Sequence, residues 1–554
     1  MAHEQPAPAA VSRQLGSAFT RRAFPLTLVL ATVGWLEWVR LRPRTPSLID
    51  DWYAITYSPR AVHALLRGDY SSAPIDLAGR YRPAYSAVWN YAQWHLLGSP
   101  SLTTAAAWGF LRGALFLVAV WLLAAWLAAR QGIAGISLVW LAPLAVAITP
   151  AIAVDLARHS PAEPMMVGGL ILGLALVGAG VRRLLDNPGV AKGGLAMIAV
   201  GYLIYLFGIY SKETSVGLLV FMPFFVKWLG PAVRTRIRRS HRSQYVLGTT
   251  AVLLLSPLLH LGLHLALSVS GGRDPYPSSH FSLGKSVLAA GVFPLVGAPG
   301  QLGTALWIFG VPAAIGIAAI AVRKRDRDGW LLVGVLATGF VMSGLALARG
   351  DMPSRYYIPW LIAVAVVAAQ GFVRLQGRFQ IIVALVVVGI AVSGTRNALA
   401  DWAKTEQSGS TAVEMAKGVL LAGCPLYLAN FDVERRVAIP RLLSFGRTRQ
   451  VQKCPTGSSQ AYVLTWQKAS LPTEFAASCR SGWQEVAVQD RVGLLACPSF
   501  AGGSYPDQDA ASGTPEATVV RLRLPEHLVD PSSLFRPGSA SHSADGGTLD
   551  TQPR

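Results

Sequence analysis

Long apolar runs alternate with short polar and charged segments from residue 24 to about residue 395. The runs are roughly 18 to 25 residues long, the length that an α-helix needs to cross a hydrocarbon core about 30 Å thick. They lack the alternation of a membrane β-barrel, and lipid cannot satisfy free backbone groups, so the spans should be helical. The pattern predicts about eleven transmembrane helices within residues 21–395. Residues 1–20, rich in Ala, Pro and Ser, are expected to be disordered and cytoplasmic.

The pattern changes beyond the last apolar run. Residues 396–500 alternate strand-like pieces with polar breaks, and residues 501–554 have the composition of a largely disordered tail. The predicted strands are 425–429, 461–466, 483–488, 492–496 and, within the tail, 518–524. The predicted fold class is therefore an all-α polytopic membrane protein with a small C-terminal α/β or β-rich domain.

Composition agrees with a membrane protein. Hydrophobic residues make up 52% of the chain and charged residues only 14%, whereas a soluble protein carries about 25% charged residues. The net charge of +20 comes mostly from residues between the apolar runs. Loop orientation and lipid headgroups explain such charges, and no basic and aromatic platform for nucleic acid is present, so nucleic acid is not an expected partner.

Loop charge also predicts the topology. The first apolar run, residues 24–38, follows Arg21 and Arg22 and is expected to be a retained signal anchor. A cytoplasmic N-terminus then places the arginine-rich short loops inside, in agreement with the positive-inside rule. With eleven spans the C-terminal domain lies outside the cytoplasm of a multi-pass protein of the plasma (inner) membrane.

All four cysteines belong to that predicted outer region: Cys424, Cys454, Cys479 and Cys497. None has metal-ligand spacing, so an oxidising compartment and one or two disulfides are expected, with three connectivities open. The alternative is four reduced thiols in a cytoplasmic tail.

The same topology gathers ionisable residues at the outer face. Charged groups at a membrane boundary are costly, and therefore each is a functional hypothesis. The set comprises Asp50, Asp51, Arg80, Arg82, His159, Glu163, Lys212, Glu213, Arg349 and Arg355.

The order of several short motifs on this face carries a resemblance. They are Asp50-Asp51 in the first outer loop (41–103), Arg80-Tyr81-Arg82-Pro83 before an aromatic, interfacial helix at 84–97, His159-x-x-x-Glu163 after the third span, Ser211-Lys212-Glu213 between the fifth and sixth, and Arg355-Tyr356-Tyr357-Ile358-Pro359 at the start of the tenth. Together they resemble the GT-C glycosyltransferases, chiefly the branch of protein O-mannosyltransferase-like and TPR-linked membrane mannosyltransferases. Arabinosyl- and aminoarabinose transferases are similar in overall layout.

The resemblance implies transfer of a sugar from a polyprenyl-phosphate donor to an acceptor hydroxyl outside the cytoplasm, by inverting single displacement. Asp50 or Asp51 would be the base that deprotonates the acceptor. Adjacent residues of an extended loop point opposite ways, so one would be the base and the other would bind acceptor or metal. The structural alternative is a helix N-cap or an Asx turn.

Cations at the outer face would stabilise the leaving phosphate. The candidates are Lys212, Arg355 and Arg82, with a weaker case for His159. Further substrate contacts would come from Arg80, Tyr81, His159, Glu163, Glu213 and Tyr356. The structural alternatives are a self-neutralising Lys212–Glu213 hairpin tip, arginines that reach toward lipid headgroups, a His159–Glu163 pair and interface-belt tyrosines.

Two features depart from the family pattern. The first loop has no Asp-x-Asp metal motif and no TPR array follows the last span. A divalent metal (Mg²⁺ or Mn²⁺) is the one cofactor to be considered, and the expected partners are the lipid-linked donor, a glycan, lipid or protein acceptor, and membrane lipids. The rival functions are a transporter or flippase, which would want midplane charges and repeat symmetry, and a non-catalytic envelope-polysaccharide assembly protein, in which Asp50 and Asp51 would be dispensable.

Overall fold

The 554-residue chain folds into two compact units in the computed structural model. We name them the membrane unit (Met1–Pro43 and Asp50–Glu406) and the tail unit (Arg44–Ile49 and Gln407–Arg554). The residues that the structure describes are 27, 30–36, 46–48, 51–69, 81–97, 100–130, 141–158, 162–186, 191–225, 227–228, 243–267, 304–324, 327–347, 354–372, 377–445, 451, 454, 459–466, 471–489, 491–502, 505 and 519–523.

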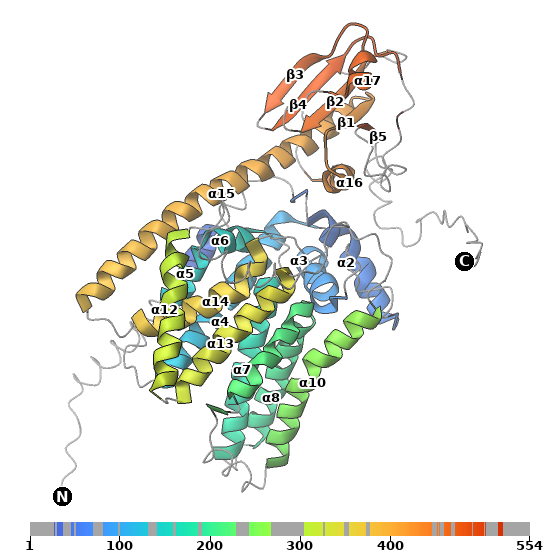
Figure 1. The fold of residues 1–554 in the computed structure, drawn as a ribbon. Coiled ribbons are helices and arrows are strands. Elements are labelled where there is room, and N and C mark those ends of the chain that lie inside the picture. Colours follow the sequence, from blue (N-terminus) through green and yellow to red (C-terminus); the bar gives the residue numbers. More distant parts are fainter. Residues whose placement is uncertain are drawn as a thin grey trace, which may run out of the picture. The chain divides into compact units, whose positions relative to one another are not determined.

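Helices make up the membrane unit (Figure 1). They are α2 (Asp51–Leu66), the π-helix η1 (Pro83–Trp89), α3 (Asn90–His95), α4 (Leu102–Arg130), α5 (Leu141–Ala147), α6 (Pro150–Ala157), α7 (Glu163–Asp186), α8 (Ala191–Ile209), the 3₁₀-helix η4 (Glu213–Val220), α10 (Ser243–Leu267), α12 (Thr304–Arg323), α13 (Arg327–Leu347), the 3₁₀-helix η5 (Ser354–Tyr357), α14 (Ile358–Phe372) and α15 (Gly377–Leu421), which continues into the tail unit.

Seven helices of the described residues are long and apolar enough to cross a membrane, and two shorter apolar helices accompany them. The fold class is confirmed as polytopic, but the described residues do not confirm the expected number of about eleven spans. One apolar run, residues 135–152, is expected from its sequence to form a span interrupted at Pro143 and Pro150; where it is described it forms two short helices, α5 and α6, and the second begins at Pro150. The apolar residues 287–299, expected from their sequence to form an interfacial or re-entrant helix, and parts of the first span lie outside the described residues.

Glycines let α7 and α8 approach closely, and Figure 1 shows the two helices side by side. A Cβ on Gly169 would lie 2.8 Å from the Cα of Gly208, and one on Gly173 would lie 2.5 Å from the backbone nitrogen of Tyr205. Small residues at such crossings allow backbone-to-backbone packing in lipid. This packing sets the start of α7 beside the end of α8, where Glu163 and Lys212 lie.

The aromatic segment at 84–97 differs from its prediction as one interfacial helix. It forms η1 and α3, and the side chains of Trp89 and Trp94 are buried at 7% and 1% exposure. Trp89 packs edge-on against Trp108, and Trp94 packs with Ala54 of α2. The aromatic residues therefore fix the first loop to the helices.

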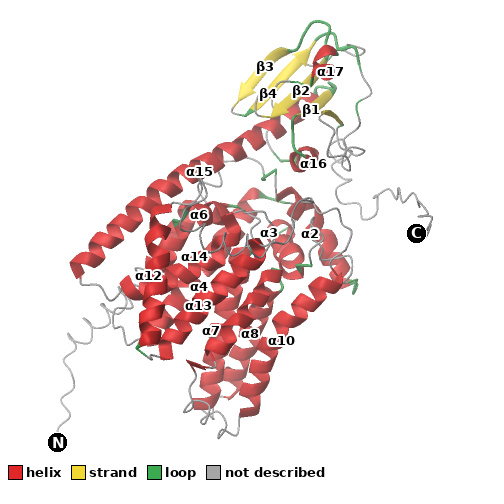
Figure 2. Cartoon of the chain, viewed as in Figure 1, coloured by secondary structure: helices red, strands yellow, loops and turns green. Residues whose placement is uncertain are grey.

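A five-stranded sheet forms the core of the tail unit (Figure 2). Its strands are β1 (Leu426–Ala429), β2 (Ala461–Trp466), β3 (Gln484–Gln489), β4 (Val492–Cys497) and β5 (Val519–Leu522), in the order β3-β4-β2-β1-β5. β1 and β2 are parallel and α16 (Val433–Arg441) connects them, whereas the other pairs are antiparallel. All five predicted strands are confirmed within one or two residues of their ends.

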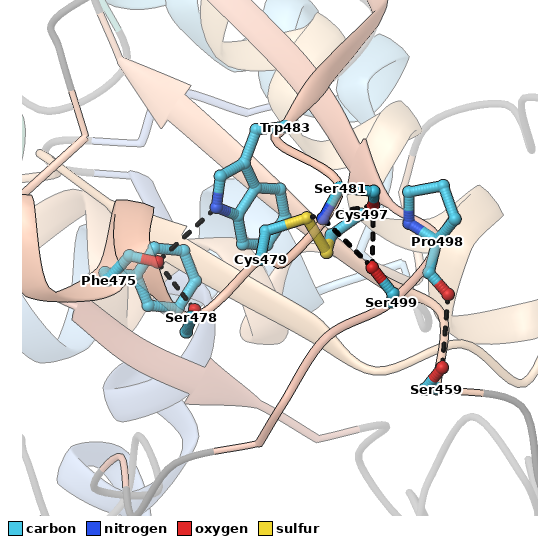
Figure 3. Close-up of a disulfide and its surroundings, with 9 residues drawn as sticks. All are labelled: Ser459, Phe475, Ser478, Cys479, Ser481, Trp483, Cys497, Pro498 and Ser499. Carbon is cyan, nitrogen blue, oxygen red and sulfur yellow. Dashed lines mark hydrogen bonds between the residues drawn. A yellow bond between two sulfur atoms is a disulfide. The ribbon is translucent and has the colours of Figure 1, made fainter.

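Two disulfides brace this sheet. Cys424, just before β1, is bonded to Cys454, and Cys479 is bonded to Cys497 at the end of β4. Figure 3 shows the second bond beside Trp483, whose ring stacks on Phe475 at 5.1 Å between centroids and whose indole N–H donates to the Phe475 carbonyl. The structure thus has one of the three connectivities that the spacing left open.

Candidate active site

The centre of the site is a buried ion pair between Lys212 and Glu163. The Lys212 ammonium donates to a carboxylate oxygen of Glu163, and each side chain is only 3% exposed. Burial lowers the pKa of Lys212, and the Glu163 charge opposes that effect. Glu163 is the first residue of α7, where the helix dipole favours an acidic side chain.

A second ion pair lies beside the first. The Arg82 guanidinium donates two hydrogen bonds to the Glu213 carboxylate, Nε to Oε2 at 2.7 Å and Nη2 to Oε1 at 2.6 Å. This fork geometry is the strong, orienting form of a charge pair. Lys212 and Glu213 are therefore neighbours in the chain that each pair elsewhere, and the hairpin-tip alternative is wrong. Arg82 is 7% exposed and is held by protein, so the headgroup alternative is wrong for it as well.

A tyrosine ring joins two of the cations. The Lys212 ammonium lies 4.2 Å from the centre of the Tyr356 ring, and the Arg355 guanidinium lies 5.6 Å from the same centre. Cations over an aromatic face within about 6 Å are attracted by the ring quadrupole. Tyr356 is thereby part of the cation cluster, and Tyr357, at 1% exposure, belongs to the core.

Irregular backbone carries these side chains. Arg82 immediately precedes the π-helix η1, Lys212 immediately precedes the 3₁₀-helix η4, and Arg355 lies in the 3₁₀-helix η5. Such non-α helices are frequent at functional sites. Because η1, η4 and α7 all begin here, their partly positive N-terminal ends add to the positive potential of the three cations.

Asp155 adds a buried carboxyl group. It lies in α6 at 1% exposure, and neither of its carboxyl oxygens has a hydrogen-bond partner among the described residues. Burial raises the pKa of Asp155 to about 7; Glu163 adds to the rise, while Arg158, Arg355 and Arg112 oppose it. Such a group is a candidate for a functional role.

Arg112 holds the end of α6 in place. It is 1% exposed, and its Nη2 donates to the backbone carbonyls of Leu156 at 3.2 Å and Asp155 at 3.4 Å, and also to that of Arg158. The last carbonyls of a helix lack partners within the helix, so one guanidinium satisfies several at once. Arg112 thereby fixes Asp155 near the cation cluster.

The structure therefore assembles part of the predicted site. It brings together Lys212, Glu163, Arg82, Glu213, Arg355 and Tyr356. Tyr81, the residue before Arg82, is 6% exposed. The backbone carbonyl oxygen of Tyr81 is 3.3 Å from Nε2 of His260 on α10. The Glu163 carboxylate is paired with Lys212, 49 positions away, and the predicted partner His159 lies outside the described residues, as do Arg80 and Asp50.

Asp51 is described, and its backbone differs from the expectation. It is the first residue of α2, not part of an extended loop, so the expectation that Asp50 and Asp51 point opposite ways loses its basis. The side chain of Asp51 is 2% exposed. α2 packs on η1 and α3, which links the loop that bears the aspartates to the segment that begins after Arg82.

Asp155, Arg112 and His260 were missed by the sequence reasoning. A usable signal existed for each of them: Arg112 is the one charged residue between Leu102 and Ala129, and Asp155 is the one charged residue from 131 to 157. Isolated charges within apolar runs are expected to have a function. His260 shares the apolar helix α10 with His264, so the same reasoning would have drawn attention to it.

Among the described residues no cluster of three potential metal ligands is found. Glu163 and Glu213 are each occupied by a cation. The expectation of a divalent ion stays a prediction.

Solved structures with a similar fold complete the comparison. The ArnT protein from Cupriavidus metallidurans, in the apo state, has a TM-score of 0.50 and 14% sequence identity over 86% of this chain and 98% of its own. The same protein bound to undecaprenyl phosphate gives the same values. The chain has the ArnT fold. No family model matches the sequence, and no curated protein matches it either.

This similarity agrees, at the level of the fold, with the resemblance that the motifs indicated. The likeness covers nearly the whole of ArnT, not merely a helical bundle. At 14% identity it establishes the fold and leaves donor, acceptor and residue roles to be argued from this chain's own side chains.

Proposed function

We propose that the protein is a membrane glycosyltransferase that moves a sugar from a polyprenyl-phosphate donor to an acceptor hydroxyl on the extracytoplasmic face. The observation that carries the proposal is the cluster of buried Lys212 and Arg82 with half-buried Arg355, in a fold whose solved neighbour binds undecaprenyl phosphate. A buried cation cluster suits a lipid phosphate, since charge interactions strengthen where water is excluded.

The reaction is a single displacement. Asp50 or Asp51 removes the proton of the acceptor hydroxyl while its oxygen attacks the anomeric carbon, and the bond between that carbon and the phosphate oxygen breaks. The electron pair leaves with the phosphate, whose new charge falls near Lys212, Arg82 and Arg355. The configuration at the anomeric carbon inverts.

The test is sugar transfer in membranes, with a panel of radiolabelled polyprenyl-phosphate sugars and variants Asp50→Asn, Asp51→Asn and both. Loss of transfer by one variant that inserts normally would identify the base, and the labelled sugar would identify the donor. Transfer at the wild-type rate by all three variants would overturn the assignment of the base.

A transporter lacks comparable support. The cations of the described site lie at the ends of candidate spans, Lys212 after the span Lys192–Ile209 and Arg355 at the first residue of the span Arg355–Phe372. A midplane site between repeats would place them within the spans.

A further inference from the structure

The two cations nearest the centre of the site are already neutralised. Lys212 is bound by Glu163 with both side chains at 3% exposure, and Arg82 is bound by Glu213 with exposures of 8% and 16%. A lysine ammonium and a carboxylate that are both this deeply buried leave no solvent layer between them. The single charge of Lys212 is already compensated by Glu163, so a lipid phosphate that binds Lys212 competes with the Glu163 carboxylate for it.

The charge of the lipid phosphate changes during the proposed reaction. The donor is a phosphodiester with one negative charge, and the polyprenyl phosphate product is a monoester with a charge of about −1.5 to −2 at pH 7. A cluster of bare cations would therefore hold the product more tightly than the donor. Product release would then limit turnover, as it does in many enzymes.

We infer that Glu163 is the counter-anion that the lipid phosphate displaces from Lys212, and that its return to Lys212 speeds the release of polyprenyl phosphate. This inference rests on the proposed function. Each binding event has to break the buried pair, so Glu163 weakens the hold on every lipid phosphate. While the phosphate occupies Lys212, the partly positive N-terminal end of α7 stabilises the displaced Glu163 carboxylate.

A purely orienting role for Glu163 makes the opposite prediction for lipid binding. If Glu163 merely orients Lys212, then its removal should weaken lipid binding. If Glu163 competes with the phosphate, its removal leaves a buried unpaired ammonium that only an incoming anion can satisfy, so the lipid should bind more tightly and stabilise the protein more.

The experiment measures binding of undecaprenyl phosphate to the full-length protein in nanodiscs. Glu163→Gln is expected to bind about tenfold more tightly than wild type, mainly through slower dissociation, and to show a larger rise in Tm on lipid addition. Glu163→Asp, which keeps the charge, is expected to stay close to wild type. Glu213→Gln is the matched control, and its effect is expected to be smaller because its pair is more exposed.

The time course of turnover distinguishes this role of Glu163 from a purely structural one. Glu163→Gln is expected to complete its first turnover and then to slow, whereas Glu163→Asp turns over steadily. If Glu163→Gln folds only with lipid present, it is purified with labelled undecaprenyl phosphate and the loss of label is followed. Slower loss than from wild type supports the inference, and equal or faster loss overturns it.

The outcomes separate the two claims. Wild type that binds undecaprenyl phosphate while Glu163→Gln binds it no better contradicts the role of Glu163 and leaves the proposed function intact. Absence of binding by both proteins contradicts the lipid-phosphate donor and the inference together.

Discussion

Lys212 and Tyr356 meet at the centre of the site, where the ammonium lies 4.2 Å from the ring centre and also donates to the Glu163 carboxylate. A 3₁₀-helix carries Tyr356, and the backbone that joins α8 to η4 carries Lys212. The ring limits where the ammonium can go when Glu163 leaves it. We therefore expect Tyr356 to keep Lys212 directed at the bound phosphate.

Tyr356→Leu should raise the KM for the donor. A cation over an aromatic ring contributes about 0.5–2 kcal/mol, which corresponds to about 2- to 30-fold in KM. Tyr356→Phe keeps the ring and should change KM by less than about twofold. Equal values for the two variants would mean that the ring does not act on Lys212.

Asp155→Asn should change how stability depends on pH. Burial raises the pKa of Asp155 to about 7 from an ordinary value of 3.8. The folded state thus binds a proton that the unfolded state has released, and stability falls as pH rises between these two values. Asp155→Asn has no carboxyl group to titrate, so its stability does not fall in this pH range for that reason.

The expected result is a higher Tm for Asp155→Asn than for wild type at pH 8, with the difference shrinking toward pH 5. The charged groups that act on Asp155 are Glu163, Arg158, Arg355 and Arg112, and none of them is changed. A difference in Tm that is the same at both pH values would show that Asp155 ionises normally.

Gly173→Ala should separate α7 from α8. The added Cβ would lie 2.5 Å from the backbone of Tyr205, which cannot move aside as a flexible side chain would. Overpacking of this kind costs about 1–3 kcal/mol. Transfer activity should fall as well, because Glu163 and Lys212 lie at the paired ends of these helices.

Gly178→Ala is the control on the same helix, since no atom lies within 4 Å of its added Cβ. It should leave Tm unchanged or raise it slightly, because alanine is the better helix former. Similar losses in both variants would mean that close packing of α7 and α8 is not what Gly173 provides.

The cysteines report the compartment of the tail unit. The structure pairs Cys424 with Cys454 and Cys479 with Cys497, leaving no free thiol among the four. A maleimide reagent added to denatured membranes should label no cysteine before reduction and all four afterwards. Four labelled cysteines without reduction would contradict the extracytoplasmic placement of this unit.

Much of the membrane unit was predictable because a chain within lipid must satisfy its backbone hydrogen bonds internally, which favours long apolar helices. Apolar length alone identified spans that correspond to α4, α7, α8, α10, α13 and α14, and strand periodicity identified β1 to β5. In the apolar run 135–152, described from residue 141, Pro143 lies inside α5 and Pro150 starts α6 after Thr149, so of the two expected interruptions the structure has the one at Pro150. Hydropathy identifies an apolar stretch but does not show where one helix ends and the next begins.

The sequence indicated which charged residues belong to the site but not which of them form ion pairs with each other. Lys212, Glu163, Arg82 and Glu213 each stood out as charges at the ends of apolar runs. Their pairing joins residues 49 and 131 positions apart and depends on the packing of α7 on α8. Asp155 is an isolated charge in the sequence, but its burial follows from the packing of α6 and is not visible in the sequence.

Replacing Lys212 tests the central claim most directly, which is that the buried cations hold the phosphate of a lipid-linked sugar donor. The measurement is initial transfer rate in membranes, with the donor that the wild type uses, for Lys212→Gln, Lys212→Arg and the exposed control Arg183→Gln. We expect Lys212→Gln to lose at least about 100-fold of the rate, as removal of one preorganised charge stabiliser does. Lys212→Arg should retain part of it and Arg183→Gln all of it. Transfer by correctly inserted Lys212→Gln at the wild-type rate would contradict the account.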